Sequence, residues 1–564
     1  MWSSQKKKDR PVRGIVRSDF HILDNSKEQS IVTFDERAPG DTPGQSHLPA
    51  MFQDAAKPYT YTNLSPYPPA SAANVLLLDA LNTPVANQME VRRKMLDYLA
   101  AIEPGTSLAI FTLTSRLRLV AGFTTDPAQL VRAAKSSATN PKSSSMLDPA
   151  TDRDLDTAIG DMANMGIDKM DAQSNLLDPI ASLQQFQADM TAYQMDECVR
   201  ITMNAMQQLA RYLSGVPGRK NLIWFSGSFP IVLDPDDALQ SPFEAMRTYS
   251  NQLQETSELL SGSRVAVYPV SATGLATPQV FDADYIGSTN VVSAVSPNGV
   301  RNQANRSNAS KDEAKLLRQN MQAEATLNQI AAETGGKAYM QTNGLRESVA
   351  DAVETGSTYY TLGFAPASLD GSFHKLKIRL DNSAGKLAYR SGYFAVPPAR
   401  SSALNPEMSV IEATTQHGAP AASQILFKAT VLDANDPSLK GARLPQGAAG
   451  EIAAPPSQVS RRVIVDIRAD AAEMALDQAP SGVRTGKIEF VLIAYDLDGR
   501  RVNYLDRGFQ MSLRPEQYSG ILANGIPIRL ALDLPPRRLF LRIVIHDLAP
   551  GKVGSSEIPY VPPQ

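Results

Sequence analysis

The sequence predicts a doubly wound α/β domain with a mostly parallel sheet, followed by an all-β domain. Val75–Leu78 is a short apolar run that stops at Asp79. Asn221–Phe225 is a second such run, and it stops at Ser226. Runs of this kind are typical of buried parallel strands whose functional loops lie at their carboxyl ends. Beyond residue 420 the pattern shows alternating strands only, which predicts the second domain.

Length and composition describe an ordinary globular chain of about three or four domains. It has 564 residues and a net charge of −3, which gives no electrostatic footprint for nucleic acid or an anionic membrane. The single cysteine, Cys198, excludes an internal disulfide and any multi-cysteine zinc site. No apolar run is long enough to span a membrane, and no apolar segment follows Met1, so we expect neither a membrane span nor a signal peptide in this chain as given.

Strand and helix patterns alternate across residues 74–345, which we expect to form the α/β domain. Ser107–Thr112 and Arg116–Phe123 are separated by too few residues for a crossover helix, so they must form an antiparallel hairpin. We expect Arg264–Val270 to be a third strand beside the two runs above, at the centre of the sheet. Trp224 should be buried, because helices cover both faces of such a sheet.

Two insertions interrupt the α/β pattern, at residues 138–190 and 276–311. The second is rich in asparagine and serine and is predicted to be disordered. The first is rich in methionine, whose flexible side chain suits either core filling under a long loop or an adaptable contact surface. We favour core filling and keep the contact surface as the alternative.

Smaller β elements flank the α/β domain. Residues 1–35 read as a β segment that lacks a preceding strand and is therefore truncated, and residues 36–73 as a linker. Residues 346–396 read as a β-strand extension and residues 397–420 as a second linker. Residues 421–564 are predicted to form a β-sandwich of the immunoglobulin or fibronectin type.

Several stretches resemble the bacterial VWFA-related family, whose members contain a degenerate von Willebrand A-like domain. They are RPVRGIVRSDFHILDNSKEQ at 10–29, VLLLDALNTP at 75–84, LAIFTLTSRLRLVAGFT at 108–124, AMQQLARYLSGVPGRKNLIWFSGSFP at 205–230, and TYYTLGFAP with GYFA within 358–395. The resemblance covers most of residues 10–395 and is most specific at PGRKNLIWFSGSFP. It implies a Rossmann-like sheet and an extracytoplasmic or secreted protein.

The resemblance also implies the place of a metal-ion-dependent adhesion site, with the pattern D-x-S-x-S after the first strand and an aspartate after the fourth. Asp79 and Thr83 fit this pattern, but Leu81 replaces a serine and Ser226 stands at the aspartate position. Mg²⁺ prefers six oxygen ligands that include carboxylates. Of Asp79, Thr83 and Ser226, only Asp79 supplies a carboxylate. We therefore expect no cofactor, with weak Mg²⁺ or Ca²⁺ binding as the alternative. Asp79 would instead cap a helix and hydrogen-bond the loop after the fourth strand.

The sequence contains no GxSxG, HExxH, P-loop or kinase pattern, which argues against an enzyme. We expect a non-enzymatic interaction or adhesion protein that binds a protein or cell-surface component through the top face of the A-like domain. A structural or self-assembly module of an extracytoplasmic complex, and a metal-dependent adhesion protein with an atypical ion site, are the alternatives. The candidate partner-binding residues are Asp79, Asn82, Thr83, Ser226, Ser228 and Phe229. Phe229 is the proposed anchor, and its alternative role is core packing.

Overall fold

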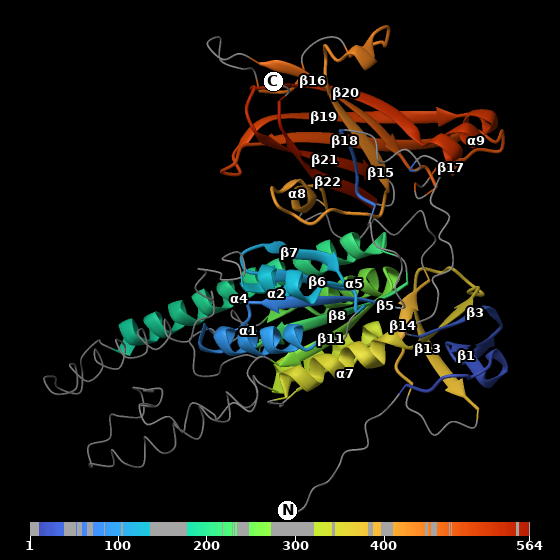
Figure 1. The fold of residues 1–564 in the computed structure, drawn as a ribbon. Coiled ribbons are helices and arrows are strands. Elements are labelled where there is room, and N and C mark those ends of the chain that lie inside the picture. The colour runs from blue at the N-terminus through green and yellow to red at the C-terminus, as the bar shows by residue number, and fades with distance from the viewer. Residues whose placement is uncertain are drawn as a thin grey trace, which may run out of the picture.

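The computed structural model arranges the chain in three parts: an α/β part, a small β part beside it, and a larger β-domain (Figure 1). It describes residues 11–38, 52, 59–64, 72–83, 85–102, 105–135, 177–216, 218–227, 229, 232–233, 247–271, 321–340, 344–381, 387–395, 410–445, 449–452, 460–472, 474, 476–548 and 552–562. The expected insertions at 138–190 and 276–311 lie largely outside these residues. No helix within the described residues is long and apolar enough to cross a membrane.

The α/β part contains a five-stranded sheet in the order β11-β8-β5-β6-β7. Its strands are β5 (Ala72–Asp79), β6 (Leu108–Leu113), β7 (Leu117–Thr124), β8 (Arg219–Ser226) and β11 (Val265–Ser271). All neighbours are parallel except β6 and β7, which form the expected hairpin. The predicted mostly parallel, doubly wound sheet is therefore confirmed. Strands β5, β8 and β11 are adjacent as expected, although β11 lies at the end of the order rather than in the centre.

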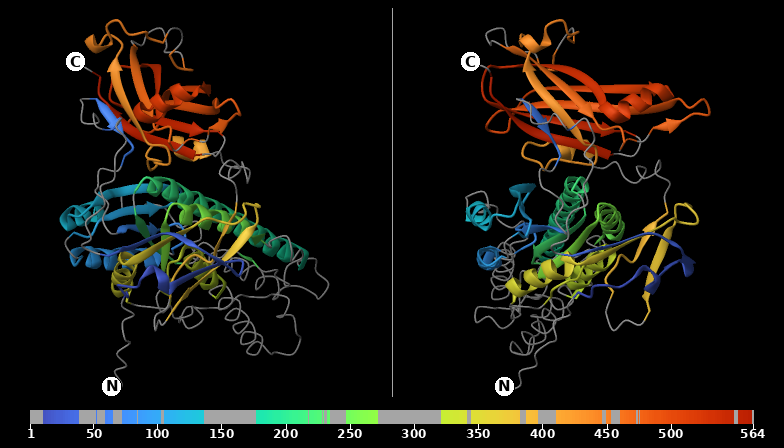
Figure 2. Two further views of the ribbon diagram at one scale, coloured as in Figure 1. Left: turned by 90° about the vertical axis from the view of Figure 1, so that its right-hand side faces the viewer. Right: turned by 45° about the vertical axis from the view of Figure 1, so that its right-hand side comes forward.

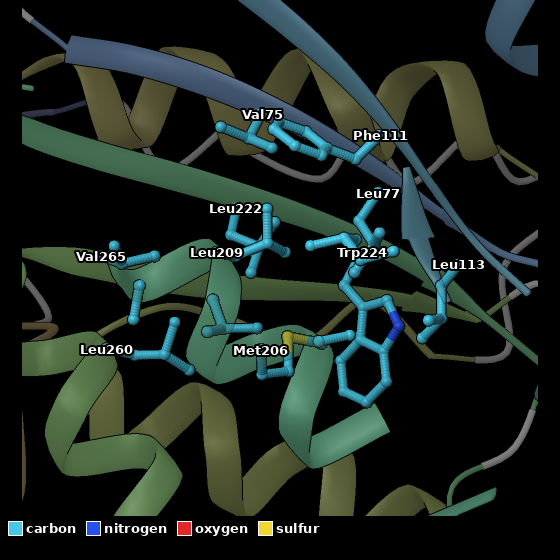
Figure 3. Packing of buried hydrophobic residues seen from close by; sticks show 14 of the residues in the cluster. Val75, Leu77, Phe111, Leu113, Met206, Leu209, Leu222, Trp224, Leu260 and Val265 are labelled. Atoms are coloured by element: carbon cyan, nitrogen blue, oxygen red, sulfur yellow. The ribbon is translucent and has the colours of Figure 1, made fainter. Parts of the chain in front are cut away.

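Helices cover both faces of this sheet. They are α1 (Val85–Ala100), α2 (Pro127–Lys135), α4 (Leu177–Ser214), α5 (Ser250–Gly262) and α7 (Leu345–Ser357), with a further helical stretch over residues 321–334. Because strand side chains alternate, Leu222 and Trp224 pack toward α4 and α5 (Figure 3), whereas Ile223 packs toward α1 and α7 on the other face. Trp224 has no exposed surface, which confirms its predicted burial. A two-residue ribbon, β9 (Val232–Leu233) with β10 (Arg247–Thr248), follows β8.

The N-terminal segment and the strands after α7 form the small β part together. Its elements are η1 (Arg17–Asp19), β1 (Phe20–Asp24), β2 (Lys27–Gln29), β3 (Ile31–Arg37), β12 (Tyr359–Phe364), β13 (Phe373–Leu380) and β14 (Gly392–Phe394). Two sheets result, in the orders β14-β13-β1-β2 and β12-β3. Residues 346–357, expected in the β-strand extension, instead belong to α7, whose Leu345, Val349 and Ala352 pack on the α/β sheet.

The β-domain consists of two antiparallel sheets that share one apolar core. Its strands are β4 (Thr60–Thr62), β15 (Phe427–Asp433), β16 (Arg461–Ala469), β17 (Asp477–Gln478), β18 (Arg484–Tyr495), β19 (Arg501–Leu513), β20 (Ile526–Leu534), β21 (Leu539–Asp547) and β22 (Lys552–Tyr560). It also holds η7 (Pro437–Leu439) and α9 (Pro515–Asn524). The sequence analysis predicted only strands in this domain and therefore missed α9, although Pro515 begins that helix and Gly525, with φ 75°, follows its last turn. Its immunoglobulin or fibronectin type stays a prediction.

Residues expected to be linkers contribute to the β-domain. Strand β4 lies within residues 36–73 and pairs with β15 (Figure 2). Next to it, the Asn63 side chain donates to the carbonyls of Ala422 and Ile425, both at 2.8 Å, and accepts from the Phe427 amide. Helix α8 (Val410–Thr415) lies within residues 397–420, and the buried Arg542 guanidinium donates to three carbonyls of that region, those of Thr414, Ala419 and Pro420.

Ser423 of the β-domain joins the C-terminal end of α4. Its amide donates to the Arg211 carbonyl at 3.0 Å, and its hydroxyl donates to the Tyr212 carbonyl at 2.6 Å. The same hydroxyl accepts from the Gly215 amide at 3.0 Å. The last carbonyls of a helix have no backbone partner within the helix. Ser423 of another domain therefore supplies a donor to the Tyr212 carbonyl and joins Ser214 in donating to that of Arg211. The contact leaves no room at Gly215, where an added Cβ would lie 2.6 Å from the Ser423 Cβ.

Gly215→Ala should lower the melting temperature by several degrees, because the new methyl group must displace Ser423 from the end of α4. Gly262→Ala is the matched control, since a Cβ there meets nothing within 4 Å and the helical position favours alanine. Calorimetric melting of the full chain measures both variants. An equal effect of the two substitutions would contradict the tight contact.

Candidate functional site

The candidate residues meet at the carboxyl ends of two adjacent parallel strands. Asp79 is the last residue of β5, and Ser226 is the last residue of β8. The register of this pair places Leu78 opposite Phe225, so the two strands end side by side. This is the edge of the sheet at which ligands bind in open α/β folds.

The Asp79 carboxylate accepts four hydrogen bonds from protein groups. Its Oδ1 accepts from the Asn82 amide at 2.9 Å. Its Oδ2 accepts from Asn82 Nδ2 at 2.7 Å, from Trp224 Nε1 at 3.0 Å and from Ser226 Oγ at 3.1 Å. Four donors are about as many as a carboxylate can take, so both oxygens are satisfied from within the fold.

Neighbouring groups extend this network to the surrounding helices. Asn82 Nδ2 also donates to Thr202 Oγ1 of α4 at 2.8 Å. Thr83 Oγ1 accepts from the Gly227 amide at 3.0 Å, and Gln88 of α1 donates to the Ala80 and Thr83 carbonyls. Asp79 was expected to cap a helix. Instead it accepts hydrogen bonds from the Asn82 amide of its own loop and from Ser226 at the end of β8. The loop after β5 is thereby tied to β8, α1 and α4.

These side chains have almost no contact with solvent. Asp79, Asn82, Thr83 and Ser226 are all at most 4% exposed. Burial raises the pKa of Asp79, and the hydrogen bonds from Asn82, Trp224 and Ser226 oppose that rise. The nearby Cys198 thiol is fully buried, and its pKa is raised to about 12 by burial first and by the charge of Asp79 second. A thiol with that pKa supplies almost no thiolate at neutral pH, which argues against a nucleophile.

Phe229 packs inside the protein rather than on its surface. It is 1% exposed, and its ring contacts that of Trp224 edge-on, with 5.4 Å between centroids. This geometry favours core packing over the anchor interpretation, because an anchor must reach the partner. Ser228 lies outside the described residues. The candidate residues that the structure describes thus form the framework beneath the top face, and none of them offers a free surface.

The residues at this position do not fit a resident divalent ion. An ion at Asp79 would have to displace the indole N–H of Trp224, which can donate but cannot coordinate. Leu81, at the position of a missing serine, is 3% exposed and belongs to the apolar core. Across the part of the chain that the structure describes, no group of three or more His, Cys, Asp or Glu side chains could hold a metal ion.

Sequence reasoning missed an apolar stripe on α4. Phe186, Met190 and Tyr193 are 59%, 43% and 64% exposed, and their spacing places them on one face of the helix. The 38 residues of α4 span about 57 Å, far more than the roughly 26 Å of the eight-residue β8. Figure 1 shows the N-terminal half of α4 extending beyond the sheet. The i, i+4, i+7 spacing was visible in the sequence, but residues up to 190 were taken as an insertion.

Comparison with known proteins gives matches to solved structures only. No family model matches the chain, and no curated protein matches it. An aerotolerance-related membrane protein from Bacteroides fragilis is 10% identical, with 50% of this chain and 98% of that chain covered and a TM-score of 0.23. Proximal thread matrix protein 1 from the mussel byssus is 11% identical (52% and 47% covered, TM-score 0.23), and the PilB minor pilin from Streptococcus sanguinis is 9% identical (51% and 60% covered, TM-score 0.23). At these values the matches carry no argument about function.

Asp79→Asn should lower the free energy of unfolding by about 2–4 kcal/mol, because an amide must turn an N–H toward groups that are themselves donors. Chemical denaturation of the full chain measures the loss. Asp498→Asn is the matched control, since Asp498 is exposed in a turn and its substitution should change stability by less than about 0.5 kcal/mol. Equal stabilities of the two variants would show that the Asp79 hydrogen bonds are not formed.

Ser226→Asp should create a metal response that the wild-type protein lacks. A second buried carboxylate beside Asp79 should lower the melting temperature in EDTA, because like charges repel in a buried site. Millimolar Mn²⁺ or Mg²⁺ should recover part of the loss by supplying positive charge. Thermal melting of both proteins, with and without the ions, is the measurement. A wild-type melting temperature that rises by several degrees with Mn²⁺ would contradict the claim that protein donors to Asp79 occupy the place of an ion.

Proposed function

We propose that residues 72–357 form a von Willebrand A-like domain and that this chain is a non-enzymatic interaction protein, which binds a protein partner without a divalent ion. The domain has the strand order of the open α/β folds, with one reversed strand at its edge. The single observation that carries the proposal is the Asp79 network, in which indole, hydroxyl and amide donors stand where a cation would compensate the carboxylate. An extracytoplasmic location, implied by the family resemblance, is part of the proposal.

The contact surface is the apolar stripe of Phe186, Met190 and Tyr193. It lies at the same end of the domain as Asp79, because α4 runs antiparallel to β8 and begins beyond the carboxyl ends of the strands (Figure 1). Tyr193 and Arg211 are 18 residues apart, or about five helical turns, so they share a face of α4. Arg211 is buried where α4 meets the β-domain. The stripe therefore continues a face of α4 that already serves as an interface.

The charges around the stripe define the partner. Asp189 is exposed next to Met190, and Asp196 and Glu197 follow on the next turns, whereas Arg200 is the one basic side chain of this segment and pairs with Glu197. A helix with aromatic and methionine anchors fits an apolar groove, and its acidic flank fits a basic rim. We therefore expect a folded partner with an apolar, positively rimmed groove. A second copy of this chain is disfavoured, since two acidic α4 segments would repel.

Phe186→Ser with Tyr193→Ser should abolish partner binding, because exposed aromatic anchors dominate interfaces of this kind. The full chain is immobilised and partner retention from an extracytoplasmic extract is quantified. Retention should persist in EDTA, fall in about 0.5 M NaCl, and drop at least about tenfold in the double variant. Met89→Ser with Leu522→Ser is the matched control, since it removes two other exposed apolar side chains. Loss of retention in EDTA, or an equal loss in both double variants, would contradict the proposal.

A further inference from the structure

A buried histidine in the small β part faces a carboxylate with each of its ring nitrogens. His374 of β13 is 5% exposed. Its Nδ1 lies 2.9 Å from Asp24 Oδ1 of β1, and its Nε2 lies 3.3 Å from both carboxylate oxygens of Asp370, in the loop before β13. Tyr393 of β14 donates to Asp24 Oδ2 at 2.9 Å. We call these four residues the His374 clasp.

The geometry requires two N–H donors on one imidazole ring. Only the protonated ring has both, because a neutral ring keeps one nitrogen as an acceptor. With a neutral ring, one carboxylate would face a nitrogen lone pair across 3.3 Å or less. We propose that the His374 clasp is a protonation-controlled latch, which holds the loop of Asp370 and strand β1 against β13 when the imidazole is charged and releases that loop when it is neutral.

The other charged groups near the clasp do not replace the imidazolium. The Arg390 guanidinium lies over the ring of Tyr393, 5.4 Å from its centroid. Burial raises the pKa of Tyr393 to about 12, so its hydroxyl stays a donor to Asp24 near neutral pH. On β13 itself the flanking Lys375 is exposed, as the alternation of the strand dictates. Lys27, opposite Asp24 on β2, is also exposed.

The contact with Asp370 is the one that opens. The Asp24 side chain is 4% exposed and that of Asp370 is 50% exposed, so only Asp370 can replace a lost hydrogen bond with water. The remaining proton therefore stays on Nδ1, facing Asp24. The loop of Asp370 also holds the end of the β-hairpin, because the Gly371 amide donates to the Ala395 carbonyl at 2.8 Å and the Ala395 amide donates to the Ser372 carbonyl. Release of the Asp370 loop from His374 should therefore loosen both that loop and the hairpin end at Ala395.

The pH dependence has a definite sign. The pKa of His374 is raised above its usual 6.5, chiefly by the hydrogen bond with Asp24 and also by that with Asp370. A raised histidine pKa means that the latch is fully closed below about pH 6.5 and is lost as the pH rises through the raised value. The loop should therefore open as the pH rises above 6.5, through the raised pKa of His374.

The test follows His374 by NMR and backbone amides by hydrogen exchange in the full chain, from about pH 5.5 to about pH 9. His374 should titrate above 6.5, and exchange of Gly371 and Ala395, corrected for the intrinsic rate, should rise about tenfold with the same midpoint. Asp370→Asn should lower the midpoint and flatten the exchange profile without disturbing the buried Asp24 contact.

His374→Gln should remove the pH dependence, and His546→Gln, in the β-domain, is the matched control that should leave it unchanged. Should His374→Gln fail to fold, Asp370→Asn still decides, because Asp370 is half-exposed and an asparagine oxygen can still accept from the Ser372 amide. A His374 midpoint at or below 6.5, or corrected exchange that does not change with pH, would overturn the latch.

Discussion

The structure of the α/β part depends on one buried carboxylate that the fold itself satisfies. Asp79 takes donors from its own loop and from β8, and through Asn82 the network reaches Thr202 of α4. A buried charge without such donors would cost several kcal/mol, so the strand ends and α4 have little freedom to shift against one another. The edge of the sheet that would hold an ion in the D-x-S-x-S pattern is here closed by hydrogen bonds to Asp79.

Helix α4 connects the separate parts of the molecule. Its middle packs into the core through Val199, Met206 and Leu209, and its end is held by Ser423 of the β-domain. Its beginning carries the exposed stripe. The β-domain in turn includes β4, which precedes the α/β part in the chain. A chain cut after residue 400 would therefore leave β4 without its sheet, and point substitutions test function more cleanly than truncation.

Sequence reasoning succeeded where local pattern decides the structure. The apolar runs that end at Asp79 and Ser226 predicted β5 and β8, and the double coverage of such strands predicted the burial of Trp224. The hairpin of β6 and β7 followed from the shortness of its connection. The expectation that no cofactor is needed, drawn from the incomplete set of oxygen ligands, stays a prediction.

Sequence reasoning failed where contacts between residues far apart in the chain decide the structure. Strand β4 is only three residues long, and nothing local indicates that it joins β15. Phe229 follows a strand end, as an exposed anchor would, yet the neighbouring Trp224 offers an apolar surface that only the folded chain creates. The candidate residues that the structure describes lie together at one edge of the sheet, but their burial was not predicted, and Thr202, which accepts from Asn82 there, comes from a helix far away in sequence.

The indole N–H of Trp224 reports most directly on the central claim that protein donors fill the ion position. The chain has two tryptophans, Trp2 and Trp224, so tryptophan-selective ¹⁵N labelling gives at most two indole resonances. Hydrogen exchange of these resonances is followed with and without millimolar Mg²⁺. The account predicts that the Trp224 indole proton, hydrogen-bonded to Asp79 and fully buried, is strongly protected and does not shift with the ion. Rapid exchange, or a shift that saturates with Mg²⁺, would contradict it.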